Sequence, residues 1–280
     1  FLIFLAGFIT SRPYIKNIVN EVKFTYVTDE YKQKDQSQPE KKIIDSEKIA
    51  KTKDKKKERE IFKSKRDNSI SLNVQTTLSL FEDLEYNLKN IRNGQQVKPV
   101  YFTKLPKDIK TLGNTKQKKD IFIQIVLPLI LAENQKIETD RKKLFTILNK
   151  KFNSPGERVW LKRRFKEYKI DDSDLAELKT RMDTIPVSIA IAQAAKESGW
   201  GTSRFALEGN ALFGQWTWSQ KGIEPVNKDA DKDFKVLAFQ ILRASVKAYK
   251  NNLNTHNGYR EFREARAKLR QEGKQIKGID

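Results

Sequence analysis

The spacing of hydrophobic positions along the chain predicts a mainly helical protein. Apolar residues recur at steps of three and four over 78–91, which is typical of an amphipathic helix, and Asn93 and Gly94 would end it. Over about 117–137 apolar residues cover most faces, so a buried helix is predicted there, with a kink at Pro128. Polar and basic helices are predicted to follow at about 139–151, 156–168 and 171–185.

The most apolar predicted helix begins at Pro186, because proline suits the first turn of a helix, with a cap at position 183 or 184. The residues over 187–195 leave almost no polar face, so this helix is expected to be central. Gly199 can adopt the left-handed conformation that ends many helices. Glu197 would therefore lie on the last turn of a buried helix.

Glu197 is the candidate catalytic residue, because its predicted position should change its acidity. An apolar environment and the negative end of the helix dipole both disfavour a charged carboxylate, so the pKa of Glu197 should rise. A carboxyl group that stays protonated near neutral pH can act as a general acid. Gln193, four residues earlier, shares the same helix face. The alternative is a glutamate that reaches solvent at a frayed helix end, and periodicity alone does not decide between them.

The polar region after this helix predicts a small β-hairpin lobe. The sequence SQKGIEPVNKDADKDFKVLAF at 219–239 places turn residues between two short extended runs. A long helix is predicted to follow over about 242–253. The lobe supplies four acidic residues that could act beside a general acid: Glu224, Asp229, Asp231 and Asp233.

The first 71 residues differ in composition from the rest of the chain. The opening FLIFLAGFI is shorter than the roughly 20 residues that span a bilayer, and it predicts a truncated signal peptide or membrane anchor within 1–15. Charged and polar residues dominate 16–71, so this segment is expected to be a disordered, flexible basic linker. The folded domain is predicted to occupy 72–280.

The amino-acid composition limits the classes of partner that the protein could bind. The 280 residues carry a formal net charge of +20, which favours polyanions such as an acidic cell wall, an anionic membrane surface or nucleic acid. The basic residues follow no nucleic-acid-binding motif, so we expect no nucleic acid partner. The chain has no cysteine and a single histidine, so neither a disulfide nor a cysteine or histidine-rich metal site is possible, and we expect no metal and no cofactor.

Two adjacent motifs carry a family resemblance. AQAAKESGWGTSRFA followed by GNALFGQW resembles the glucosaminidase family of peptidoglycan hydrolases, described as mannosyl-glycoprotein endo-beta-N-acetylglucosaminidase-like. Within it the chain most resembles the bacterial Bax-type proteins. The resemblance covers roughly 78–270 and includes FEDLEYNLKNIRNGQQVKPVYFTKLP, IVLPLILAEN and AYKNNLNTHNGYREFREAR.

This resemblance implies a fold and a set of active-site residues. The fold would be a mainly α, lysozyme-like helical domain with a small β-hairpin lobe. Glu197 matches the catalytic acid of the family, and Tyr259 matches the functional tyrosine that follows the last long helix. Family members place a second acid in the hairpin lobe, for which Glu224 is the candidate here. The alternative for Tyr259 is a packing tyrosine with a satisfied hydroxyl group.

The resemblance also implies a sugar-binding groove, with the turn at 209–214 as its floor. Flat aromatic rings stack on sugar rings, and several aromatic side chains follow Glu197 closely in sequence. The predicted substrate-binding residues are Gln193, Trp200, Asn210, Phe213, Trp216 and Trp218.

The sequence as a whole predicts a peptidoglycan hydrolase that cleaves the β-1,4 bond after N-acetylglucosamine. Its partners would be peptidoglycan glycan strands and, through the basic linker, an anionic membrane surface. We expect a periplasmic or envelope location, with or without an inner-membrane anchor at the N-terminus. A lytic transglycosylase and a non-catalytic wall-binding module are the alternatives. A retaining, an inverting and a substrate-assisted mechanism all stay open.

Overall fold

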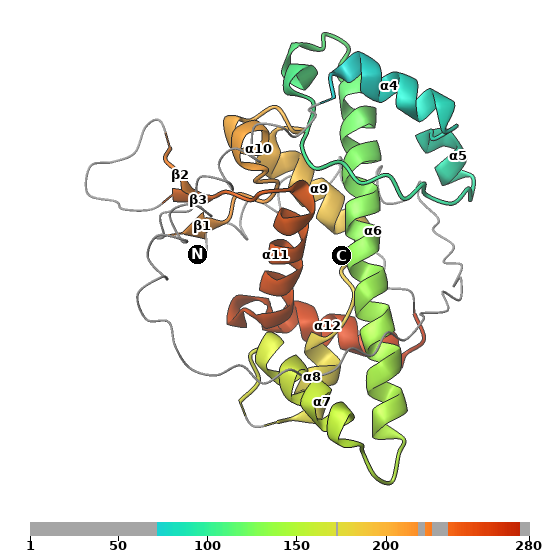
Figure 1. The fold of residues 1–280 in the computed structure, drawn as a ribbon, viewed down its shortest axis with the longest axis vertical. Helices are drawn as coiled ribbons and strands as arrows, with labels where there is room; N and C mark the ends of the chain where they lie inside the picture. Colours follow the sequence, from blue (N-terminus) through green and yellow to red (C-terminus); the bar gives the residue numbers. More distant parts are fainter. Residues whose placement is uncertain (1–71, 172, 218–221, 226–234, 275–280) are drawn as a thin grey trace, which may run out of the picture. The chain divides into compact units, whose positions relative to one another are not determined.

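The computed structural model describes residues 72–171, 173–217, 222–225 and 235–274 (Figure 1). The predictions for the leader or anchor at 1–15 and for the linker at 16–71 lie outside the described residues. Within the described ranges, no helix combines the length and the hydrophobicity needed to cross a bilayer.

The longest helix, α6 (Thr115–Leu148), runs through the centre of the fold (Figure 1). It begins where the Asn114 side chain accepts a hydrogen bond from the backbone N–H of Gln117 at 3.0 Å. The helices predicted at 117–137 and 139–151 are therefore one helix, and the predicted break was wrong. Buried positions continue at helical spacing across that point, and Pro128 lies inside the helix without ending it. The buried residues around the expected break are Asn134, Ile137, Arg141 and Leu144.

The helix predicted over 78–91 is instead two helices, α4 (Val74–Asp83) and α5 (Leu88–Arg92). Glu85 adopts a left-handed conformation between them, with a φ of 51°. Asn87 then begins α5 by accepting a hydrogen bond from the N–H of Asn90 at 2.8 Å. The break buries the Tyr86 ring, so the hydrophobic spacing that suggested one helix reflects two helices with a buried tyrosine between them.

The lower end of α6 packs against two further helices, α7 (Pro155–Glu167) and α8 (Leu175–Arg181) (Figure 1). Ser154 and Glu157 form a reciprocal capping box at the start of α7, which confirms the helix predicted at 156–168. The α8 helix is shorter than the predicted 171–185, because Asp174 caps it. A separate hydrophobic cluster fills this end of the molecule: Ile137, Leu144, Phe165, Tyr168, Ile170, Leu178 and Met182.

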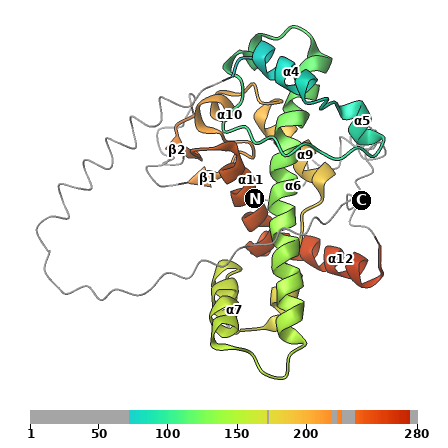
Figure 2. The ribbon, with the colours of Figure 1, turned by 45° about the vertical axis from the view of Figure 1, so that its right-hand side comes forward.

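Two helices that pack on α6 carry most of the candidate site. They are α9 (Val187–Ser198) and α11 (Leu242–Thr255), and both appear beside α6 in Figures 1 and 2. The α9 helix follows Pro186 without a side-chain cap, so the cap predicted at position 183 or 184 was wrong. Asp183 has another role.

The Asp183 carboxylate anchors the C-terminal helix α12 (Arg260–Gln271) to the link that precedes α9. Arg270 Nε donates to Asp183 Oδ2 at 2.7 Å, and Arg270 Nη2 donates to Oδ1 at 2.5 Å. Arg266 and Arg141 each bring a guanidinium nitrogen within 4.0 Å of the same carboxylate. Asp183 and Arg266 are buried at 2% and 0% exposure, so this ion cluster is internal.

The chain turns tightly between α9 and the short helix α10 (Arg204–Gly209). Gly201 has a φ of +80°, and a Cβ added there would lie 2.8 Å from Leu105 and 3.0 Å from Phe122. Only glycine therefore lets the backbone approach this closely. Leu105 precedes a 3₁₀ helix, η1 (Lys107–Thr111).

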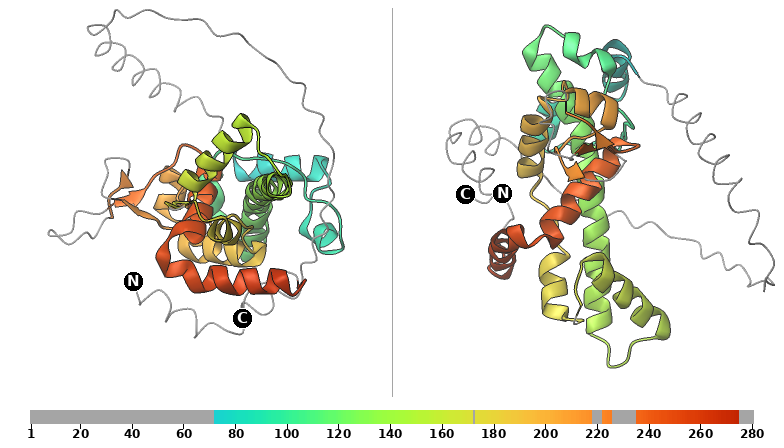
Figure 3. Two further views of the ribbon diagram at one scale, coloured as in Figure 1. Left: turned by 90° about the horizontal axis from the view of Figure 1, so that it is seen from below. Right: turned by 90° about the vertical axis from the view of Figure 1, so that its left-hand side faces the viewer.

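The predicted hairpin lobe is a three-stranded antiparallel sheet. Its strands are β1 (Trp216–Thr217), β2 (Gly222–Ile223) and β3 (Lys235–Leu237), in the order β1-β3-β2. Figure 3 shows the sheet on the side of α6 opposite α4 and α5. The expectation of a mainly α fold with a small β lobe is confirmed.

Candidate active site

Glu197 lies on the last turn of α9, as predicted. Gly199 ends the helix in the left-handed conformation, with a φ of 57°, and the N–H of Trp200 donates to the carbonyl of Ala195 at 2.8 Å. The side chain of Glu197 reaches solvent on one side, yet its partial burial raises the pKa of the carboxyl group, while the neighbouring Lys196 acts in the opposite direction. The carboxyl group thus holds its proton to a higher pH than an exposed glutamate does.

The turn at 209–214 brings backbone against this carboxyl group. A Cβ added to Gly214, which has a φ of +56°, would lie 3.3 Å from Glu197 Oε2. Asn210 holds the turn in place, because its Nδ2 donates to the carbonyls of Phe239 at 3.0 Å and Gln240 at 3.1 Å. The Asn210 side chain is buried, so the structure gives this predicted sugar-binding residue a role in fixing the turn.

We expect Gly214→Ala to lower the activity of the site more than its stability loss explains. The added methyl group would press on Glu197 Oε2, and a left-handed φ strains any residue with a Cβ. Gly94→Ala is the matched control, because Gly94 also has a positive φ but has open space around its Cβ position. Steady-state turnover and thermal unfolding of both variants would be compared. Equal activity losses in the two would contradict the placement of Gly214 against Glu197.

Tyr259 lies near enough to Glu197 for the two groups to interact electrostatically, although 62 positions separate them in sequence. It ends the 3₁₀ helix η2 (Asn257–Tyr259), which follows α11 directly. Burial raises the pKa of the Tyr259 phenol, and the negative charge of Glu197 raises it further. The fold therefore brings together the two residues that the family resemblance assigns to catalysis.

Side chains from α9, α11 and the turn at 209–214 also contact one another. The rings of Phe213 and Tyr249 stack with their centroids 4.0 Å apart and their planes inclined by 5°. The Tyr249 hydroxyl donates a hydrogen bond to Gln193 Oε1. Tyr249 was not predicted from the sequence, because its position on an amphipathic helix is typical of a core residue.

The tryptophans do not share one surface. The Trp200 ring packs edge-to-face on Phe122 of α6, with centroids 5.8 Å apart, and Lys119 Nζ lies 5.0 Å from its centroid. Trp216 on β1 is 50% exposed and faces solvent. Trp218 lies outside the described residues. Trp216 is thus the described tryptophan that best fits a sugar-stacking role.

Glu224, the candidate second acid, lies at the end of β2. Its carboxylate pairs with Lys235 Nζ at 3.1 Å, and its backbone carbonyl accepts a hydrogen bond from Arg204. The side chain is 61% exposed. The other three acidic residues of the lobe, Asp229, Asp231 and Asp233, lie outside the described residues.

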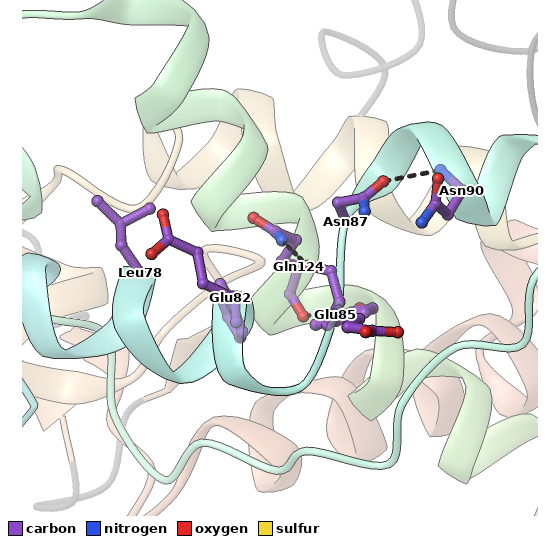
Figure 4. Close-up of a pocket in the computed structure, with 8 residues that line it drawn as sticks. Leu78, Glu82, Glu85, Asn87, Asn90 and Gln124 are labelled. Atoms are coloured by element: carbon purple, nitrogen blue, oxygen red, sulfur yellow. Dashed lines mark hydrogen bonds between the residues drawn. The ribbon is translucent and has the colours of Figure 1, made fainter.

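A cavity of about 430 Å³ lies elsewhere, along α4, the turn after it and α6 (Figure 4). Glu82, Glu85 and the amide group of Gln124 surround it, and none of the predicted site residues lines it. Within the part of the chain that the structure describes, no group of three or more His, Asp or Glu side chains could hold a metal ion.

Comparisons with known proteins match this part of the chain. Residues 173–277 match the Glucosaminidase family model, described as mannosyl-glycoprotein endo-beta-N-acetylglucosaminidase. The chain is 34% identical over 175 residues to Protein bax of Escherichia coli (strain K12), a match that covers 60% of this chain and 62% of that protein. No solved structure matches the chain. The resemblance inferred from the sequence is confirmed: residues 173–277, which carry Glu197, Gly214 and Tyr259, match the glucosaminidase family model, and the chain is similar to Protein bax.

Proposed function

We propose that this protein is a peptidoglycan hydrolase that cleaves the β-1,4 bond after N-acetylglucosamine. The observation that carries the proposal is the position of Glu197, whose carboxyl group has a raised pKa, lies against the backbone of Gly214 and interacts electrostatically with Tyr259. The match to the glucosaminidase family supports a glycosidase and a glycan substrate.

In this mechanism the protonated carboxyl group of Glu197 donates its proton to the glycosidic oxygen as the bond to the anomeric carbon breaks. Positive charge then develops on the sugar ring, and the newly formed Glu197 carboxylate stabilises it. The Tyr259 hydroxyl, whose pKa the charge of this carboxylate raises, would orient either the attacking water or the acetamido group of the substrate.

The second carboxylate could come from the protein or be unnecessary. Glu224 is the candidate protein residue, and the alternative is attack by the acetamido oxygen of the substrate itself. A comparison of the turnover of Glu224→Gln with that of wild type tests whether Glu224 is this carboxylate. A loss of turnover close to that of Glu197→Gln would identify Glu224 as the protein carboxylate in the reaction. Turnover close to wild type would exclude Glu224 and leave the substrate-assisted route or one of the aspartates of the lobe.

The setting we propose is the bacterial envelope. A net charge of +20 favours retention on the anionic wall, and the basic residues within 16–71 would also favour an anionic membrane surface. The apolar start of the sequence would direct the protein to the periplasm or anchor it to the inner membrane.

Digestion of purified peptidoglycan, with mass analysis of the released ends, tests the proposed function. Reducing N-acetylglucosamine ends would support the hydrolase. Anhydro sugar ends would identify a lytic transglycosylase instead, and the absence of any released product would leave a wall-binding module.

We expect Tyr259→Phe to lower turnover strongly while the unfolding temperature changes little. The substitution removes one half-buried hydroxyl group and keeps the ring. Turnover of a soluble wall fragment and thermal unfolding would be measured on the same samples. If stability falls and turnover per folded molecule is unchanged, then Tyr259 is a packing residue.

A further inference from the structure

The amide group of Gln193 is held in one orientation by a buried tyrosine. Tyr249 donates its single hydroxyl proton to Gln193 Oε1. The tyrosine itself is fixed, because it is 6% exposed and its ring stacks on Phe213 with the two planes nearly parallel. Burial, followed by the nearby Tyr259, raises the pKa of the Tyr249 phenol well above its usual range. The hydroxyl therefore stays a donor wherever the protein is folded.

This hydrogen bond determines which end of the amide is free. Since an amide carries its oxygen and its nitrogen on opposite sides, binding the oxygen to Tyr249 turns the NH₂ group away from it. No side-chain hydrogen bond from Gln193 Nε2 occurs among the described residues, and the residue is only partly buried. The NH₂ group is thus an oriented donor with access to solvent, one helical turn from Glu197 on the same face of α9.

We propose that Gln193 Nε2 donates a hydrogen bond to the carbonyl oxygen of the substrate acetamido group, and that Tyr249 is the positioning residue that holds the amide in this orientation. The proposal rests on the proposed glycosidase function and specifies how its site would select N-acetylated sugars.

The chemistry around Gln193 favours an amide carbonyl over other acceptors. A sugar hydroxyl both donates and accepts, so it could pair with either end of a glutamine amide and would need no fixed orientation. A substrate carboxylate would place a second negative charge near Glu197 once that group ionises. An amide carbonyl is neutral and only accepts hydrogen bonds. It therefore matches the NH₂ group of Gln193, whose orientation Tyr249 fixes.

The test measures sugar binding rather than turnover, in the full-length chain that carries Glu197→Gln to prevent cleavage. Two neutral probes are titrated: tetra-N-acetylchitotetraose, and cellotetraose, which has hydroxyl groups in place of the acetamido groups. The measured quantity is the ratio of their dissociation constants. Tyr249→Phe removes the hydroxyl and allows the Gln193 amide to rotate, so we expect the preference for the acetylated sugar to fall about five- to tenfold, as for loss of one neutral hydrogen bond.

Two more variants separate positioning from folding. Gln193→Leu removes the donor without changing the buried tyrosine, and it should lower the preference at least as much as Tyr249→Phe. Tyr86→Phe is the matched control, because Tyr86 is also a buried tyrosine and donates at 3.0 Å to the backbone carbonyl of Gln124, away from Glu197. It should lower stability and leave the preference unchanged.

The outcomes distinguish the two proposals. If Tyr249→Phe and Gln193→Leu bind both sugars with the wild-type preference, or lose both sugars equally, the positioning role of Tyr249 is wrong while the glycosidase proposal stands. If the chain with Glu197→Gln as its only change binds neither sugar, the glycan function itself fails.

Discussion

Replacing Glu197 by glutamine should remove most peptidoglycan hydrolysis and leave the fold intact. Glutamine keeps the size and the hydrogen-bonding capacity of the side chain but has no acidic proton to donate. A general acid typically contributes about 10²–10⁴-fold to a rate, so turnover should fall by at least this factor. The measurement is the rate of product release from purified wall, with thermal unfolding of the same samples to confirm folding.

Glu208→Gln is the matched control for this variant. Glu208 lies on α10 with an exposed side chain and pairs with Arg204 at 3.6 Å, so its loss should leave turnover within a few-fold of wild type. The wild-type enzyme should also lose activity as the pH rises through the raised pKa of Glu197, because only the protonated carboxyl group can donate. Turnover of Glu197→Gln close to wild type would remove Glu197 from the mechanism.

Asp183→Asn should lower the stability of the whole described fold. The substitution keeps the shape of the side chain but removes its charge, and it leaves the buried guanidinium group of Arg266 without its carboxylate. Loss of one partner from a buried ion pair costs about 3–5 kcal/mol. The free energy of unfolding, measured by chemical denaturation, should fall by roughly that amount.

Glu264→Gln provides the comparison for an ion pair at the surface. Glu264 pairs with Arg260 at 2.8 Å, and both side chains are more than half exposed, so this variant should unfold at the same denaturant concentration as wild type. If Asp183→Asn unfolds at the same denaturant concentration as Glu264→Gln, the Asp183 cluster contributes little to stability.

The part of the site that depends on local sequence was predictable. The apolar run before Glu197 and the glycine after it were enough to place the carboxyl group on the last turn of a helix, because helix ends depend on a few neighbouring residues. Tyr259 is different. Its place beside Glu197 depends on how α11 packs on α6, and only the resemblance to a family indicated it.

The interactions that could not be predicted join residues far apart in the sequence. Lys250 and Arg266 occupy charged positions on α11 and α12 that would ordinarily face solvent. Both are buried, because Lys250 Nζ meets Glu133 at 3.0 Å and Arg266 meets Asp183. Helical periodicity carries no information about such partners. The same reason explains why Tyr249, in contact with Gln193 and Phe213, was not recognised as part of the site.

The central helix α6 shows that the folded unit is larger than the segment that matches the family model. It lies outside 173–277, yet it packs on α9 and α11 and carries Glu133, the buried counter-ion of Lys250. Asn134 of α6 also exchanges two hydrogen bonds with the backbone of Ile185, at 2.8 and 2.9 Å, just before α9 begins. A chain cut at 173 would keep every proposed catalytic residue but lose the scaffold that orients them. Inactivating substitutions should therefore arise in α6 as readily as within 173–277.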